Sequence, residues 1–269
     1  EQPNAEHANQ LIELYAEYVQ NNPNDVDENA RLLQKSARLY KDNKEYIKAA
    51  GILVMAIKQF FVSTSTAENI IELATIYQDN LDNQEAYIAT LNGFLNAFPD
   101  HEAAEEISIE LGETRVNITE HMIDLGTAIF ETPDGSPGFD PDAANRYIGH
   151  SELYAMTNGG NSELASELLM KAASVARTGN SYTKALEFYQ WISQIYPETD
   201  AGKKALFLHA FTLDNDMGKK EEAKPLYEQF IAAHPEHSFA DDAEFQLKNL
   251  GKSSSEIIDA FEKEPNTSN

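Results

Sequence analysis

Tyr182-Thr183-Lys184-Ala185-Leu186-Glu187-Phe188-Tyr189 and Lys220-Glu221-Glu222-Ala223-Lys224-Pro225-Leu226-Tyr227 are two copies of one pattern, set 38 residues apart. In each copy an alanine is followed one turn later by a tyrosine, and a proline (Pro197 or Pro235) comes eight residues after that tyrosine. A small residue lets two helices approach closely, and proline ends a helix because it lacks an N–H donor. The repeated pattern therefore predicts helical hairpins.

Earlier parts of the chain follow the same scheme. Ala30–Ser63 fits a whole repeat without a gap, except that Phe61 stands where the final proline is expected. A copy over 67–100 needs a slip of one residue, and the copy over 204–237 needs an insertion near Asp214–Met217. Such self-similarity at a fixed period indicates an array of stacked hairpins.

These spacings resemble tetratricopeptide repeats, which have small residues in both helices, a tyrosine late in the first and a proline after the second. The resemblance implies an all-α fold, an α-α superhelix (a TPR-like solenoid) of about fourteen antiparallel helices, and a use in binding other proteins. The stretch 162–263 is also similar to envelope lipoproteins of the Bacteroidota, and its last helix pair resembles the repeats of the periplasmic Tol–Pal coordinator and of outer-membrane assembly lipoproteins. That similarity implies a periplasmic or outer-membrane location, with any lipid anchor lying upstream of Glu1.

Three segments are expected along the chain: an N-terminal TPR-like helical array over 1–131, a loop and linking helix over 132–161, and a C-terminal array with a capping helix over 162–269. Three prolines and two glycines between Thr132 and Pro141 predict the loop. The expected helices span residues 5–21, 27–42, 45–61, 67–80, 84–97, 101–114, 117–131, 141–157, 162–178, 181–195, 199–215, 219–233, 238–249 and 254–263.

Several helix starts carry capping signals. In a capping box a short polar side chain and an acid three residues later satisfy free N–H groups. Asp140 is expected to cap the helix that follows the loop, with Pro141 in its first turn. The pairs with capping-box spacing are Asp25 with Glu28, Ser65 with Glu68, and Ser253 with Glu256.

Composition excludes several classes of function. The formal net charge is −25, which argues against nucleic acid as a partner because an acidic chain repels phosphate. Residues 64–170 hold 2 basic and 20 acidic side chains, and this region is either a solubilising surface or a face for a basic protein. The chain has no cysteine, so disulfides and thiolate zinc sites are excluded. The longest apolar run, Ala49–Ile57, is far shorter than the ~20 residues that cross a bilayer.

Motifs that suggest chemistry have simpler explanations. Gly251-Lys252-Ser253 resembles the end of a phosphate-binding loop, but Gln246 stands where that loop needs glycine. His234 and His237 span a helix end without a third metal ligand, and the aspartates of 134–142 lack the closing glutamate of a calcium loop. We therefore expect no catalytic residue, no metal ligand and no cofactor, and the chain is not expected to be an enzyme.

Candidate partner-binding residues fall on first helices, which line the concave groove in the resembled family. Phe207 and Phe211 lie one turn apart and would form an apolar anchor site. The N-terminal repeat would carry a basic strip on the same face, without the asparagine with which some relatives hold a C-terminal carboxylate. The members of this strip are Arg31, Gln34, Arg38 and Lys41.

Two functions remain open from the sequence. The first is a non-catalytic scaffold or adaptor of the bacterial cell envelope that binds a protein through its groove or its acidic surface. The second is an accessory module that binds a peptide or glycan for an outer-membrane transport or secretion complex. A pocket lined by Trp191, or by Phe207 and Phe211, would favour the second function. The oligomeric state is not determined by the sequence.

Overall fold

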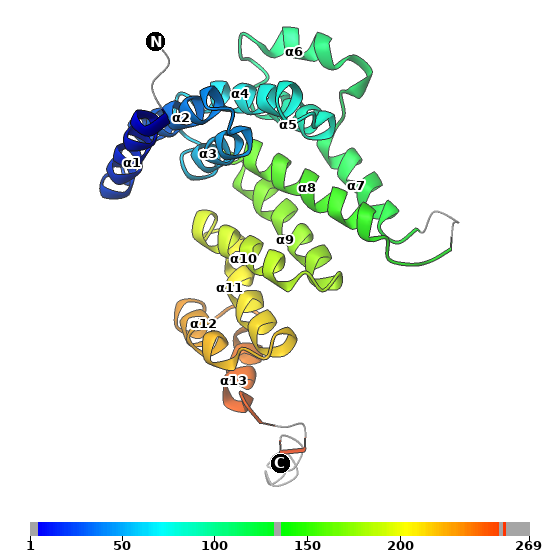
Figure 1. The fold of residues 1–269 in the computed structure, drawn as a ribbon. Coiled ribbons are helices and arrows are strands. Elements are labelled where there is room, and N and C mark those ends of the chain that lie inside the picture. The colour runs from blue at the N-terminus through cyan, green and yellow to red at the C-terminus, as the bar shows by residue number, and fades with distance from the viewer. Residues whose placement is uncertain (1–4, 132–135, 253–254, 257–269) are drawn as a thin grey trace. The chain divides into compact units, whose positions relative to one another are not determined.

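The computed structural model describes residues 5–131, 136–252 and 255–256, and it confirms the predicted all-α helical-repeat fold (Figure 1). Within these residues the only β-type pairing is one isolated β-bridge between Glu131 and Pro137. The helices are α1 (Ala5–Asn21), α2 (Val26–Asp42), α3 (Tyr46–Gln59), α4 (Thr66–Asp79), α5 (Gln84–Ala97), α6 (Ala104–Leu111), α7 (Ile118–Ala128), α8 (Pro141–Thr157), α9 (Ser162–Thr178), α10 (Tyr182–Ile195), α11 (Asp200–Phe211), α12 (Lys220–Ala233) and α13 (Ala240–Asn249).

The chain divides into two compact units, residues 1–172 and 173–269, and the division falls inside α9. The sequence places its boundaries earlier, around a linking segment over 132–161. The difference arises because α8, the helix of that segment, packs against α5 and α7 and so completes the first unit. Its Tyr154 side chain is 1% exposed, which shows how fully α8 is buried there.

In the first unit, neighbouring helices pack in chain order from α1 to α5. The contacts depend on small side chains at helical spacing: Ala37 on α2 and Ala49 and Ala56 on α3 are all fully buried. Alanine at these positions brings the helix axes close together, and larger side chains such as Leu53 fill the space between them. The small-residue pattern in the sequence therefore marks the helix contacts.

In the second unit, α10, α11, α12 and α13 pack in the same consecutive way. The core is aromatic: Tyr227 and Phe230 of α12 are fully buried and their rings pack against Phe207 of α11. Ala210 and Ala223 provide the close approach between these two helices.

One extra residue is accommodated where α11 ends. Thr212–Asp216 forms a π-helix, a wider turn that holds one more residue than an α-helical turn. Arg177 of α9 holds this segment through a forked ion pair with Asp216. The insertion that the sequence places near Asp214–Met217 is thus a widened helical turn.

Two capping boxes are not formed. Asp25 and Ser65 do stand at the N-caps of α2 and α4, but neither side chain accepts a bond from the helix start. Both side chains have other partners: the Asp25 carboxylate accepts from the Tyr18 hydroxyl at 2.8 Å, and the Ser65 hydroxyl lies 3.1 Å from the Ser63 hydroxyl. Asp140, where ψ is 109°, does cap α8 as expected, with Pro141 in the first turn. Ser253 lies outside the described residues.

Helix limits differ from expectation mainly in the weak part of the repeat. The segment expected over 101–114 is α6 followed by a short 3-10 turn, Gly112–Thr114, and α7 ends at Ala128. Of the capping helix expected over 254–263, only residues 255–256 are described, and they are helical. No helix in the described chain is both long and apolar enough to cross a membrane.

Candidate binding grooves

The expected basic strip on α2 is used within the fold. Arg38 donates from Nε and Nη2 to the Glu72 carboxylate on α4 at 2.9–3.2 Å, and Arg31 is paired with Glu28 on its own helix. Gln34 is buried and Lys41 is half-buried. The face that carries these residues therefore joins α2 to α4, the first helix of the next hairpin. The structure does not present the four residues as one free basic surface.

Phe207 and Phe211, the expected apolar anchor site, lie in and beside the core of the second unit. Phe207 is only 6% exposed because its ring packs against Phe230, at a centroid distance of 5.6 Å, and against Phe239, at 4.9 Å. Phe211 is half-buried, and the Arg177 guanidinium lies 5.0 Å from its ring centroid. Both rings pack within the second unit, Phe207 in its core and Phe211 against that core.

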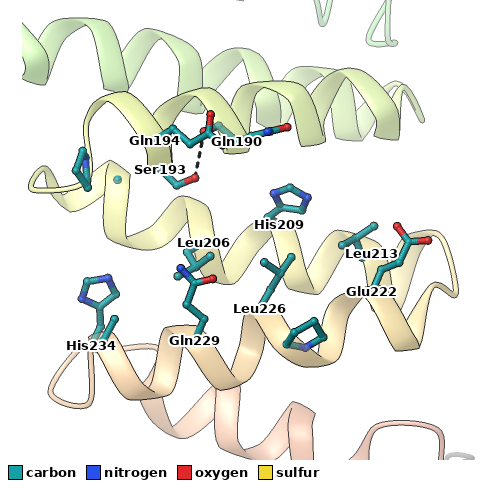
Figure 2. Close-up of a pocket in the computed structure, with 14 residues that line it drawn as sticks. Gln190, Ser193, Gln194, Leu206, His209, Leu213, Glu222, Leu226, Gln229 and His234 are labelled. Atoms are coloured by element: carbon teal, nitrogen blue, oxygen red, sulfur yellow. Dashed lines mark hydrogen bonds between the residues drawn. The ribbon is translucent and has the colours of Figure 1, made fainter. Parts of the chain in front are cut away.

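An open groove with a volume of about 630 Å³ lies elsewhere in the second unit, between α10 and α12, with α11 as its floor (Figure 2). We call it the C-terminal groove. Trp191, Phe207 and Phe211 do not line it; Trp191 is buried. Its lining comprises Gln190, Ser193, Gln194, Pro197, Gly202, Leu206, His209, Leu213, Glu222, Pro225, Leu226, Gln229, Ala233 and His234.

Polar side chains stand on both walls of the C-terminal groove, beside apolar ones such as Leu226. Figure 2 shows Gln190 and Gln194 on one wall and Gln229 on the other, and amide side chains both donate and accept hydrogen bonds. Burial lowers the pKa of His209, and burial and the charge of Lys203 lower the pKa of His234, so both imidazoles are uncharged at neutral pH. The amides and neutral imidazoles suit a hydrogen-bonding ligand surface such as a peptide backbone or sugar hydroxyls, and Glu222 adds one carboxylate to the lining.

A second groove, with a volume of about 410 Å³, lies in the first unit between α1 and α3, with α2 as its floor. We call it the N-terminal groove. Among the described residues no charged side chain lines it, and its walls are mainly aliphatic, which suits an apolar ligand surface. Its lining comprises Ile12, Ala16, Val19, Gln20, Pro23, Leu33, Ser36, Ile52, Met55, Gln59 and Phe60.

The two grooves are the same site in two copies of the repeat. On the flanking helices the shared positions are 174 residues apart, and on the floor helix they are 173 apart. The second copy is one residue shorter between Pro197 and Leu206, and the π-helix after the floor positions restores the spacing. The matching pairs are Ala16/Gln190, Val19/Ser193, Gln20/Gln194, Pro23/Pro197, Leu33/Leu206, Ser36/His209, Ile52/Leu226, Met55/Gln229, Gln59/Ala233 and Phe60/His234.

Residues 204–237, which run from within α11 through α12 into the following turn, match the family model described as tetratricopeptide repeat. Together with the helical arrays, the match supports a tetratricopeptide-repeat protein, and such repeats generally mediate binding between proteins. No curated protein matches the chain.

Both grooves are absent from the expectations drawn from sequence, although a signal for them was present. Pro23 and Pro197 each end a helix of the pattern and are 174 residues apart, so they mark corresponding edges of the two sites. The ligand surface was instead expected on the opposite side of the first helices. In the described residues no group of three or more His, Asp and Glu side chains is arranged to hold a metal ion.

Proposed function

We propose that this chain is a non-catalytic scaffold that binds a protein partner through its repeat grooves. The observation that supports this function most directly is the recurrence of one open site, at matching residues, in both units. A scaffold needs concave, accessible surfaces on a rigid frame, and stacked helical hairpins provide them. Lining residues such as Met55 and Gln229 project from helices whose opposite faces are buried in the core.

We further propose that the protein works in the bacterial cell envelope. The support is the similarity of 162–263 to envelope lipoproteins, together with an acidic, cysteine-free composition. The test is fractionation of cells that express the protein from its own unprocessed gene, with fatty-acid labelling of the product. Recovery in the membrane fraction with a lipid label would support the envelope role, and an unlabelled cytosolic product would contradict it.

Site-specific photocrosslinking tests the scaffold function itself. A photoreactive amino acid would replace Gln20 in the N-terminal groove or Gln229 in the C-terminal groove, both exposed. We expect a discrete adduct with the same protein in repeated experiments from at least one of these positions. Lys171, exposed on α9 and in neither groove lining, is the matched control position and should give no such adduct. Equal crosslinking from all three positions would argue against groove binding.

A specific observation also favours the second function, an accessory module for a peptide or glycan. The C-terminal groove has a drug-like volume of about 630 Å³, and three glutamines and two histidines line it. Titration calorimetry with neutral peptides and with oligosaccharides would test it. We expect Gln229→Leu and Gln190→Leu to weaken binding of a true ligand by at least tenfold, while Gln59→Leu in the N-terminal groove leaves it unchanged.

A further inference from the structure

Helix α8 occupies a surface of the first unit that corresponds to the open grooves. It approaches α5 so closely that a Cβ atom on Gly93 would lie 2.0 Å from Thr157 Oγ1. At the same end of α8, Asn96 donates to Asn158 at 2.6 Å. The turn after α8 lies against the ring of Phe61, which a Cβ on Gly159 would meet at 2.9 Å. Figure 1 shows α8 beside the α3–α5 part of the array.

The correspondence follows from the ends of the second helices. Phe60 ends α3 and Phe98 ends α5, so equivalent residues are 38 apart. Gly93, which contacts α8, therefore matches Met55, a residue that lines the N-terminal groove. Phe61, on the other wall, matches Pro23, which lines the same groove. The site that is open between α1 and α3 is thus covered by a helix one repeat further along.

Where α8 makes a polar contact with α5, the equivalent position beside the N-terminal groove is apolar. His150 of α8 meets Glu85 through Nε2 at 2.9 Å, and the residue equivalent to Glu85 is Ile47. Ile47 is 79% exposed and Met55 is 40% exposed, so two large apolar side chains stand uncovered at positions that touch a helix in the next repeat. Together with the apolar lining of the N-terminal groove, these side chains provide apolar surface for a partner.

We infer that the N-terminal groove binds an α-helix of a partner protein, and that this helix presents an uncharged aliphatic face. This inference rests on the proposed scaffold function and names the partner surface. Two observations define the occupant: the equivalent site already holds a helix, and the described groove lining contains no charge with which a charged face could pair. Because α3 borders both sites, the partner helix continues the packing that α8 begins.

The C-terminal groove differs at the positions that matter for this partner. Gln229 replaces Met55 there, and Glu221 and Glu222 stand in place of Ile47 and Lys48. An aliphatic helix face would leave these polar groups without hydrogen-bond partners, which costs binding free energy. An aliphatic helix should therefore bind the N-terminal groove more tightly than the C-terminal groove.

The test uses a synthetic peptide of residues 141–160 that carries His150→Leu, since leucine suits Ile47 where histidine suits Glu85. A hydrocarbon staple between positions 145 and 149 keeps it helical; Asn145 is exposed and Gly149 has no neighbour near its Cβ position. With the full chain we expect saturable binding with a Kd in the micromolar range. Methyl resonances of Ile52 and Met55 should shift in NMR spectra, whereas those of Leu206 and Leu226 should not.

Three chain variants sharpen the experiment. Met55→Glu and Ile47→Glu should each weaken binding of the His150→Leu peptide at least tenfold. Ile47→Glu should also restore preference for the peptide with the natural His150, because it recreates the Glu85 contact. Ile109→Glu on α6, where the isoleucine is 75% exposed and outside the groove, is the matched control and should leave the Kd unchanged. If circular dichroism shows that one of these variants is misfolded, Ala16→Trp takes its place, because a tryptophan on α1 would fill the groove.

The outcomes separate the inference from the proposed function. Absence of binding, binding that Met55→Glu and Ile47→Glu do not weaken, or shifts confined to α10–α12 would each overturn the helix site. If these results came together with a discrete crosslinked partner at Gln229, the scaffold function would stand and only this inference would fail. If neither groove position crosslinked a partner while the peptide bound as expected, the proposed function would be the part in doubt.

Discussion

At the scale of single residues, three side chains join α5, α7 and α8 through one hydrogen-bonded chain. His150 is buried; its Nε2 lies 2.9 Å from Glu85 Oε1, and its Nδ1 lies 3.1 Å from His121 Nε2. With Nε2–H of His150 donating to the carboxylate, Nδ1 accepts from His121. This chain of contacts ties α7, through His121, to the buried contact between α5 and α8.

Stability should therefore decrease in mild acid. Burial lowers the pKa of His121, and the neighbouring His150 lowers it further, so the unfolded chain binds more protons than the folded one as pH falls below about 6.5. The contribution is present above that pH and is lost as pH falls toward the folded-state pKa. Urea unfolding between pH 7.5 and 5 should show a shallower pH slope for His121→Gln, by less than one proton equivalent. His7→Gln, at an exposed position on α1, should leave the slope unchanged.

Gly93 lies at a close contact between α5 and α8. Gly93→Ala places a Cβ 2.0 Å from Thr157 Oγ1, and overpacking of this kind costs about 1–3 kcal/mol of unfolding free energy. Gly51→Ala is the matched control: it is also inside a helix, but nothing lies within 4 Å of its Cβ position, so it should stabilise by about 0.5–1 kcal/mol. Adding Thr157→Gly to Gly93→Ala should recover part of the loss. Equal effects of the two alanine variants would contradict the close contact.

Single residues were the least predictable level from sequence. The spacing of Phe207 and Phe211 was read correctly as one helical face, but which face is buried depends on helices distant in sequence. Phe239, from the turn after α12, covers Phe207, and no local pattern announces that contact. The same applies to Arg38, whose partner Glu72 is 34 residues away.

At the scale of elements, the start of α8 is fixed by its cap. Asp140 Oδ1 accepts from the backbone N–H groups of Asp142 at 2.8 Å and of Ala143 at 3.1 Å. Asp140→Ala should cost about 1 kcal/mol in urea unfolding, because both N–H groups lose their partner. Ser181→Ala at the N-cap of α10 should change stability much less, since Ser181 forms no side-chain cap bond. A similar loss in both variants would show that the cap bonds are not the cause.

Helix existence was predictable because small residues and prolines recur at helical spacing, and those signals are local. Caps were predictable only in part. The residue types at Asp25 and Ser65 suit a capping box, but their side chains bond to Tyr18 and Ser63 instead. A four-residue motif does not show which of several partners a polar side chain takes.

At the scale of the whole molecule, each compact unit has its own core, so damage should remain local. Phe207→Ala removes a buried ring from the second unit and should cost about 3–5 kcal/mol there. Hydrogen exchange measured by mass spectrometry should show faster exchange in α11–α13 and unchanged exchange in α2–α5. Phe94→Ala, at a fully buried ring of the first unit, should give the reverse pattern. Loss of protection throughout the chain in either variant would contradict separate cores.

The class of the fold was readable from sequence, whereas the limits of the units and the ligand surfaces were not. Their positions depend on α8, which follows the least regular stretch of the chain and packs back onto α5. Periodicity identifies α8 as a helix, but it cannot show that this helix covers one copy of a site whose other copies stay open.

The π-helix at Thr212–Asp216 has a consequence for protein engineering. Inserting one residue into an α-helix rotates everything beyond it by about 100°, which would normally misalign a repeat. Here the wide turn absorbs that rotation before α12 begins, so the residues that line the groove walls stand at positions that match those of the N-terminal copy. The ligand preference of each groove therefore depends on its side chains and not on the number of residues in its backbone. The residues that define one groove can be transplanted onto the other by substitution alone, without adding or deleting a position.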